Sequence, residues 1–222
     1  MLGQGAYRLS DVARYARLPA STVRAWFKER SDSAGRGPIF RADYDPVDDD
    51  YAVSFLDLVD AYVARFFRQE GVSPGIIRKA RENLQVELST KHPFAHAELC
   101  TDGVRIIRKA AGAVRSTEFT DVISRQGWFS QMAKHLKRIV YAGDTKLAVK
   151  WNIATGVVID PCRAYGKPST ESSGIATFVL ANQVNANGGS AEVVADLFDI
   201  SECDVVNAVN FELKYGLRLR VA

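Results

Sequence analysis

Hydrogen-bonding side chains between Leu9 and Arg30 form the part of this chain best suited to contact nucleic acid. Ser21 and Thr22 can bond to phosphates or to base edges. Arg24 can grip O6 and N7 of a guanine with two hydrogen bonds, and Lys28 adds a positive charge. We therefore expect Ser21, Thr22 and Arg24 to lie at DNA bases.

The same stretch predicts two short helices joined by a tight turn. Ser10 is placed to cap the first helix, and Pro19 disfavours a helical conformation at the residue before it. The second helix is expected to begin near Ala20. Its apolar, buried face consists of Val23, Trp26 and Phe27. This is the layout of a helix-turn-helix, whose second helix enters the major groove. The alternative is an ordinary helical hairpin with a solvated basic face.

Charge is unevenly distributed near the N-terminus. Residues 1–42 hold eight basic and three acidic residues, a net charge of +5, whereas residues 43–60 hold seven aspartates and no basic residue. A basic head would contact phosphates and release counterions from DNA. The residues expected at the DNA backbone are Arg14, Lys28, Arg30, Arg36 and Arg41. The acidic block could keep DNA off one side, but a solvated loop is the favoured interpretation.

A short β element is expected directly after the two helices. Gly35 and Gly37 mark a turn, and the stretch from Pro38 to Tyr44 predicts a strand. A helix-turn-helix followed by a small hairpin is a winged one, and Arg36 and Arg41 would then lie beside the DNA backbone.

Two longer helices are predicted next, from Phe55 to Glu70 behind the capping pair Ser54 and Asp57, and from Pro74 to about Leu88. The N-terminal part of the chain resembles the MerR-type winged helix-turn-helix. Three stretches carry the resemblance: RLSDVARYARLPASTVRAWF, PIFRADY and GVSPGIIR. The resemblance covers about the first 90 residues and implies a DNA-binding domain over residues 1–90.

The middle of the chain, residues 91–155, predicts a small α+β connector. The expected elements are a hairpin from Glu98 to Ile107, a strand from Ala113 to Phe119, a helix from Trp128 to Ile139 and a strand from Lys146 to Ile153.

One group of residues in the connector has the spacing of metal ligands. His92, His96 and Cys100 are four apart, so a helix would align them on one side. Pro93 and the strand-like character around Cys100 oppose that helix, although His135 could approach in the fold. Structural histidines and a buried thiol are the favoured interpretation, and we predict no metal site and no cofactor.

The last part, residues 156–222, predicts a helical domain. A short strand from Val157 to Ile159 precedes helices from Ile175 to Ala186, Ala191 to Phe198 and Glu202 to Tyr215. The last two helices have a second helix-turn-helix shape. Its outer face is expected to carry Glu192, Asp196, Asp199, Glu202, Asp204 and Glu212. Such acidity would repel phosphates, so this shape is predicted to bind protein or to dimerise.

This domain resembles a small antitoxin domain. The residues that carry the resemblance are Ile159, Asp160, Pro161, Gly166, Pro168, Gly189, Ser190, Glu192, Val194, Ala195, Val205 and Ala208. Relatives usually show Gly-Thr-Arg-Ile where this chain has Ser172-Ser173-Gly174-Ile175, so the contact of that arginine is missing.

With the MerR-like head, the whole chain resembles a VapB-type antitoxin of a type II toxin–antitoxin system. The resemblance implies that the protein neutralises a PIN-domain ribonuclease toxin and represses its own operon by binding operator DNA. The tail from Leu213 to Ala222 alternates apolar and basic residues like an unpaired strand. It could extend a sheet of the toxin or place an arginine among the toxin's acidic ligands. The expected toxin contacts are Leu217, Arg218, Leu219 and Arg220. Pairing within its own domain is the equal alternative.

The composition is that of a globular protein, with 47% apolar and 25% charged residues. No apolar run is long enough to span a bilayer, and the N-terminus lacks the apolar core of a signal peptide. Three widely spaced cysteines indicate reduced thiols and a cytoplasmic setting. No catalytic triad, Cys/His pair or phosphate-binding glycine loop indicates an enzyme.

These observations predict an α+β, mainly helical fold divided into residues 1–90, 91–155 and 156–222. The predicted function is that of a homodimeric antitoxin that binds operator DNA and a toxin. A stand-alone MerR-like regulator that binds a small effector in its middle domain is the second hypothesis.

Overall fold

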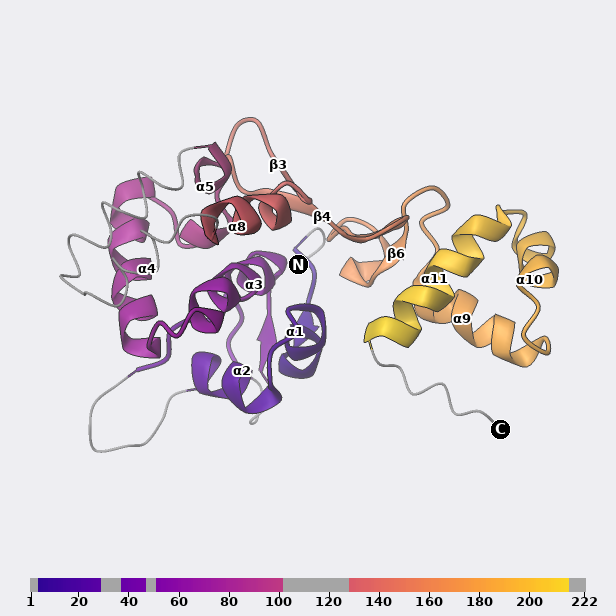
Figure 1. Ribbon diagram of the computed structural model, residues 1–222, viewed down its shortest axis with the longest axis horizontal. Helices are drawn as coiled ribbons and strands as arrows, with labels where there is room; N and C mark the ends of the chain where they lie inside the picture. Colours follow the sequence, from indigo (N-terminus) through magenta and orange to yellow (C-terminus); the bar gives the residue numbers. More distant parts are fainter. Residues whose placement is uncertain (1–3, 29–36, 47–50, 102–127, 216–222) are drawn as a thin grey trace. The chain divides into compact units, whose positions relative to one another are not determined.

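The computed structural model describes residues 4–28, 37–46, 51–101 and 128–215. These form two compact units, which we call the N-terminal unit (residues 6–148) and the C-terminal unit (from residue 149) (Figure 1). Helices and small sheets both occur, so the predicted α+β class is confirmed. The boundary between the units falls inside the expected connector, and the division into three domains stays a prediction.

Helix α3 (Phe55–Gln69) is the central helix of the N-terminal unit and is buried along most of its length. The predicted capping pair is confirmed, since the Ser54 hydroxyl accepts from the Asp57 amide at 3.1 Å and the Asp57 carboxylate accepts from the Ser54 amide at 3.0 Å. Among the elements that contact α3 are α1 (Leu9–Tyr15), α4 (Pro74–Leu88), α8 (Trp128–Leu136) and the short helix η1 (Pro93–Ala95) (Figure 1).

The first helix begins one residue earlier than its expected cap. Because α1 starts at Leu9, Ser10 lies inside its first turn, and the prediction that Ser10 caps the helix was wrong. The Asp11 carboxylate instead accepts from the Arg8 amide at 3.1 Å. Directly before α1, strand β1 (Tyr7–Arg8) pairs antiparallel with β2 (Ala52–Val53).

The expected strand from Pro38 to Tyr44 was also wrong. The described residues 37–46, which we call the anchored segment, contain no strand. The amide of Phe40 donates to the carbonyl of Trp26 at 3.0 Å. Because a helix end takes up this amide and the helices bury the apolar side chains, the segment needs no partner strand.

Phe40 joins the anchored segment to two helices. It is fully buried, and its ring lies 5.2 Å from that of Phe27 and 5.7 Å from that of Trp26, both in α2 (Ala20–Phe27). The guanidinium of Arg81 in α4 lies 5.1 Å from the Phe40 ring centre. One side chain therefore packs against α2 and α4 at once.

The first part of the connector differs from the predicted structure. Glu98–Thr101 form a helical turn, α5, where a strand was expected, because the chain turns after η1 instead of extending. The rest of that hairpin and the expected strand from Ala113 to Phe119 lie outside the described residues. Helix α8 is confirmed and is followed by β3 (Ile139–Tyr141).

The C-terminal unit combines a small antiparallel sheet with three helices. Strand β4 (Ala148–Ala154) pairs with β5 (Val157–Ile159), which pairs with β6 (Ser169–Thr170). Helices α9 (Thr177–Ala186), α10 (Ala191–Phe198) and α11 (Glu202–Tyr215) follow. Both α10 and α11 have the predicted bounds. The buried core between the helices consists of Leu180, Val194, Ala195, Val205 and Ala208. No helix in the described ranges is long and apolar enough to cross a membrane.

The position of Phe40 predicts a large effect on stability. Phe40→Ala should lower the free energy of unfolding of the N-terminal unit by about 3–5 kcal/mol, because it removes a fully buried ring and leaves a cavity. Chemical denaturation followed by tryptophan fluorescence measures this change. Val86→Ala is the matched control, since Val86 is 82% exposed. Equal effects of the two substitutions would contradict this account of the anchored segment.

Candidate nucleic-acid interface

Helices α1 and α2 pack together across a turn of four residues, as the sequence predicted. Leu18 is buried beneath the turn, and its amide donates to the carbonyl of Ala13 at 2.9 Å. Pro19 precedes α2, and its carbonyl accepts from Thr22 at 2.9 Å and from Val23 at 3.1 Å. The predicted apolar face of α2 is confirmed, because Val23, Trp26 and Phe27 are all buried.

The opposite face of α2 presents the predicted polar side chains. Ser21 and Arg24 are exposed, while Thr22 and Lys28 are half-buried. Among the described residues, Arg24 makes no ion pair, so its guanidinium has donors available. The ammonium of Lys28 lies 4.9 Å from the ring centre of Tyr51.

Arg24 and Lys28 share a hollow of about 300 Å³ with residues that the sequence did not indicate. Arg8 and Ser10 come from the start of the chain, and Tyr51 comes from the segment before β2. The pairing of β1 with β2 brings these segments together. Since that pairing joins residues more than 40 positions apart, no local pattern in the sequence could reveal it. Arg8 was visible only as one of the basic residues of the head.

The other predicted DNA contacts are distributed differently. Arg14 is half-buried, and a terminal nitrogen of its guanidinium donates to the Tyr15 hydroxyl at 2.6 Å. Arg41 is exposed but lines a separate, larger hollow beside α4. Arg30 and Arg36 lie outside the described residues. The expected toxin contacts Leu217, Arg218, Leu219 and Arg220 also lie outside them.

Buried charges hold the anchored segment against the helices. The two ring nitrogens of His92 face carboxylates, with Nε2 3.0 Å from Asp43 and Nδ1 3.2 Å from Asp60. Asp57 lies 3.8 Å from Nδ1, and Arg81 lies 3.7 Å from Asp60. Asp57 and Asp60 are fully buried, so the prediction that the whole acidic block is a solvated loop was wrong for these two residues.

Two pKa values in this cluster are raised. Burial raises the pKa of Asp57 to about 6, although amide hydrogen bonds and His92 act against the shift. For His92, burial opposes the positive charge, but the hydrogen bond to Asp60 and the charges of Asp60, Asp57 and Asp43 outweigh it and raise the pKa. The folded state therefore favours the charged form of His92 more than the unfolded state does.

The residues with metal-ligand spacing do not share one helix. Helix η1 covers Pro93–Ala95 only, so His92 and His96 lie on either side of it. The Nδ1 atom of His96 accepts from the amide of Glu98 at 3.3 Å. The side chain of Cys100 lies outside the described part, and His135 bonds to the Tyr62 hydroxyl at 3.0 Å.

The alternative donor set of Asp43, Asp57 and His92 has ligand atoms within 4.8 Å of one another. A cation there would compete with the contacts that the two nitrogens of His92 already make with Asp43 and Asp60.

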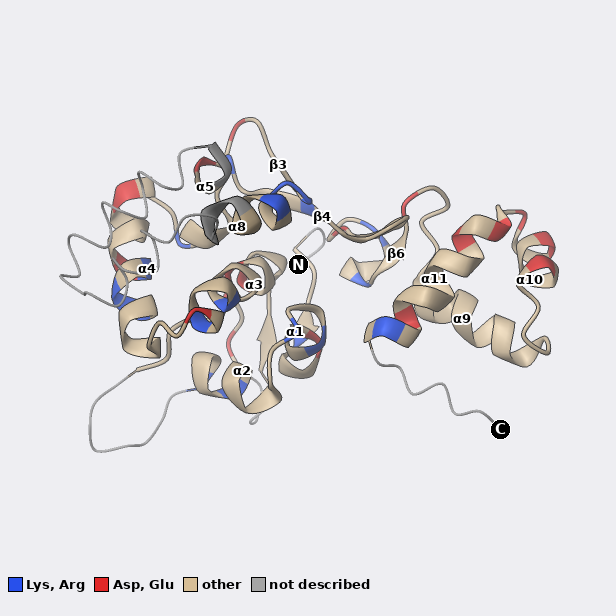
Figure 2. Cartoon of the chain, viewed as in Figure 1, with Lys and Arg blue, Asp and Glu red and all other residues tan. Residues whose placement is uncertain are grey.

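The acidic face predicted for the C-terminal unit is smaller than expected. Asp204 and Glu212 are buried, because each accepts a hydrogen bond from a hydroxyl of a neighbouring element. Ser172 donates to Asp204 at 2.6 Å, and Thr177 donates to Glu212. The acidic residues of the predicted face that are exposed are Glu192, Asp196, Asp199 and Glu202. Figure 2 shows acidic residues on both α10 and α11.

Large apolar side chains are exposed on the same two helices. Val193 and Leu197 of α10 are 49% and 64% exposed, and Leu213 of α11 is 60% exposed. The spacing of Val193 and Leu197 places them on one side of α10. Exposed apolar residues beside acidic ones are typical of surfaces that bind other proteins.

No model of a known protein family matches the sequence. The chain is 25% identical to a Mycobacterium tuberculosis protein named "Putative antitoxin VapB45", over 92% of each chain. It also superimposes on the crystal structure of Rv2018 from Mycobacterium tuberculosis with a TM-score of 0.74 and 26% identity, covering 91% of this chain and 96% of that one. The chain has a fold similar to that of Rv2018. The similarity extends over both units and is not confined to the helix-turn-helix-like part.

The charge cluster predicts a pH-dependent stability. A carboxyl whose pKa rises from 3.8 to about 6 on folding holds its proton more tightly when folded, so its contribution to stability is lost as the pH rises from about 4 to about 6. The raised pKa of His92 also makes the protein less stable as the pH rises, but over a higher pH range. Its contribution to stability is present below the ordinary histidine pKa of about 6.5 and is lost above the pKa of His92 in the folded protein.

Asp57→Asn should remove the first of these contributions. The melting temperature of the variant should rise relative to that of the wild type as the pH increases from about 4 to about 6. Asp45→Asn, which changes an exposed acid of the anchored segment, is the control and should follow the wild type. Parallel pH profiles for wild type and Asp57→Asn would contradict the assignment.

Proposed function

We propose that this protein is an antitoxin that neutralises a PIN-domain ribonuclease toxin and represses its own operon by binding operator DNA. The observation that carries the proposal is the end-to-end similarity to a protein named as a VapB45 antitoxin. The likeness in fold to Rv2018 over nearly the whole of both chains supports it, because the two units are retained together.

The N-terminal unit is the proposed DNA-binding part. The exposed Ser21 and Arg24 and the half-buried Thr22 on one face of α2 support contacts to bases, because the opposite face is anchored in the core. Lys28, Arg41 and the arginines proposed at the backbone would then contact phosphates. A homodimer would place two such helices in successive half-sites about 34 Å apart.

The C-terminal unit is the proposed toxin-binding part. Its exposed Val193, Leu197 and Leu213 favour a protein partner, whereas its exposed acidic residues disfavour a second DNA contact. The tail with Leu217, Arg218, Leu219 and Arg220 is also proposed to contact the toxin.

Substitution on α2 tests the DNA-binding proposal. Arg24→Ala should weaken operator binding by about 1–3 kcal/mol and relax specificity at one base pair, because it removes a bidentate base contact. Arg41→Ala should weaken binding to all sequences alike. Fluorescence anisotropy with the protein's own promoter and with scrambled duplexes measures both effects. Lys214→Ala, an exposed cation of the C-terminal unit, is the control. Unchanged operator affinity for Arg24→Ala would refute this docking of α2.

Deletion of residues 217–222 tests the role of the tail. Co-purification with the product of the adjacent reading frame should fail, and the ribonuclease should stay active, while affinity for the promoter is retained. Full inhibition of the nuclease by the truncated protein would exclude the tail as the neutralising segment. A paired substitution of Val193 and Leu197 by serine then distinguishes the surface of α10 from the tail.

A further inference from the structure

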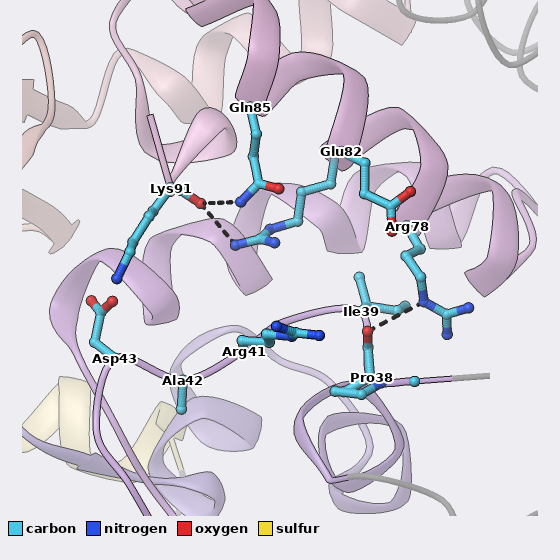
Figure 3. A pocket seen from close by; sticks show the side chains of 11 residues that line it. Pro38, Ile39, Arg41, Ala42, Asp43, Arg78, Glu82, Gln85 and Lys91 are labelled. Carbon is cyan, nitrogen blue, oxygen red and sulfur yellow. Dashed lines mark hydrogen bonds between the residues drawn. The ribbon is translucent and has the colours of Figure 1, made fainter. Parts of the chain in front are cut away.

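A hollow of about 750 Å³ lies in the N-terminal unit between the anchored segment and α4 (Figure 3). Its volume is within the range of about 300–1,000 Å³ typical of small-molecule sites. Basic side chains line it from both walls. They are Arg41 of the anchored segment, Arg78 and Arg81 of α4, and Lys91 after α4.

Two of these arginines are held in place by the surrounding structure. The Nε atom of Arg78 donates to the carbonyl of Pro38 at 3.2 Å, and the two terminal nitrogens of the guanidinium point away from that carbonyl (Figure 3). A terminal nitrogen of Arg81 donates to the carbonyl of Lys91 at 2.8 Å, and the guanidinium stacks on Phe40. The Nε atom of Arg81 is buried and has no hydrogen-bond partner. Little side-chain freedom remains to be lost when these groups bind a ligand.

The hollow carries an excess of positive charge. Arg41 and Lys91 are exposed and form no ion pair among the described residues. Two acids, Asp43 and Glu82, also line the hollow. The Asp43 carboxylate is already engaged, because it lies 3.0 Å from Nε2 of His92 and accepts from the Ser54 hydroxyl at 2.7 Å. Asp43 therefore neutralises little of the charge that faces the hollow.

We propose that this hollow binds a small molecule that carries a phosphate or diphosphate group. Guanidinium groups bind phosphate oxygens through paired, charge-assisted hydrogen bonds, and an ammonium group adds a point charge. Arg41 and Arg78 supply such donors from facing walls, and Lys91 supplies the ammonium (Figure 3). The volume leaves room for a nucleoside beside the phosphates. The inference does not rest on the proposed binding of DNA or toxin.

The phosphates of a DNA backbone are the other source of the same chemistry. The concave shape favours the small molecule, because the cations face one another across a cavity instead of forming a row along a convex surface. The binding test therefore uses free phosphorylated probes and duplex DNA in separate arms.

Isothermal titration calorimetry of the full chain with inorganic pyrophosphate and with ADP tests the proposal. At least one probe should bind to the wild type. The variants Lys91→Gln and Arg78→Gln/Lys91→Gln should bind about 10-fold or more weakly, because a charge-assisted hydrogen bond contributes roughly this factor. Lys79→Gln is the matched control, since Lys79 is an exposed cation of α4 that does not line the hollow. Circular dichroism and thermal melting establish that each variant is folded. The single variant Lys91→Gln tests the site even if the double variant fails to fold.

Three results would overturn the proposal. One is that neither probe binds to the wild type at millimolar concentration. The second is that a probe binds but Lys91→Gln and Lys79→Gln bind it equally well, because the probe would then lie elsewhere. In the third, the probes do not bind while Lys91→Gln weakens binding to duplex DNA, which would assign the hollow to the DNA backbone.

Discussion

The packing of Phe40 is the constraint on which the N-terminal unit depends. Its ring is fully buried against Trp26 and Phe27 on one side, and the guanidinium of Arg81 covers it on another. Aromatic rings in such arrangements gain roughly 0.5–1.5 kcal/mol per pair beyond the area they bury. The position of α2 relative to α4 therefore depends on a side chain that belongs to neither helix. Any function of the outer face of α2 therefore depends on the packing of Phe40 against its inner face.

The charges around His92 favour one position of the anchored segment against the helices. Burying an ionised group costs several kcal/mol unless partners compensate it, and here Asp43, Asp57 and Asp60 share the charges of His92 and Arg81. These partners come from the anchored segment, from α3, from α4 and from the chain before η1. Asp43 contacts His92 only when the anchored segment lies in this position, so a shifted segment would leave Nε2 of His92 without its carboxylate partner. We infer that the cluster determines the position of the segment more than it adds to stability.

Local patterns in the sequence predicted the helices well and the long-range contacts poorly. The apolar spacing of Val23, Trp26 and Phe27 was sufficient for α2, and the bounds predicted for α10 and α11 were confirmed. The apolar residues of the anchored segment predicted a strand, because the same alternation suits pairing with a strand and packing against helices. Burial of Asp60, Asp204 and Glu212 was missed, since their partners lie far along the chain and an acid with no local partner is usually solvated. Burial of Asp57 was missed although its local capping partner Ser54 was predicted, because its contacts with Asp43 and His92 are also long-range. The proposed interface was predictable on α2 itself, but its neighbours Arg8 and Tyr51 required the pairing of β1 with β2.

The two hollows described above, both in the N-terminal unit, are connected through Phe40. Arg81 lines the larger hollow and stacks on Phe40, and Phe40 packs on Trp26 and Phe27, whose helix carries Arg24 in the smaller hollow. A ligand that displaced Arg81 or the anchored segment would change the contacts that Phe40 makes with α2. By linkage, DNA bound to α2 would change the affinity of that ligand by the same factor. The coupling between ligand binding and DNA binding is limited by how far the packed rings around Phe40 can move. Close-packed contacts resist small displacements and change between discrete arrangements.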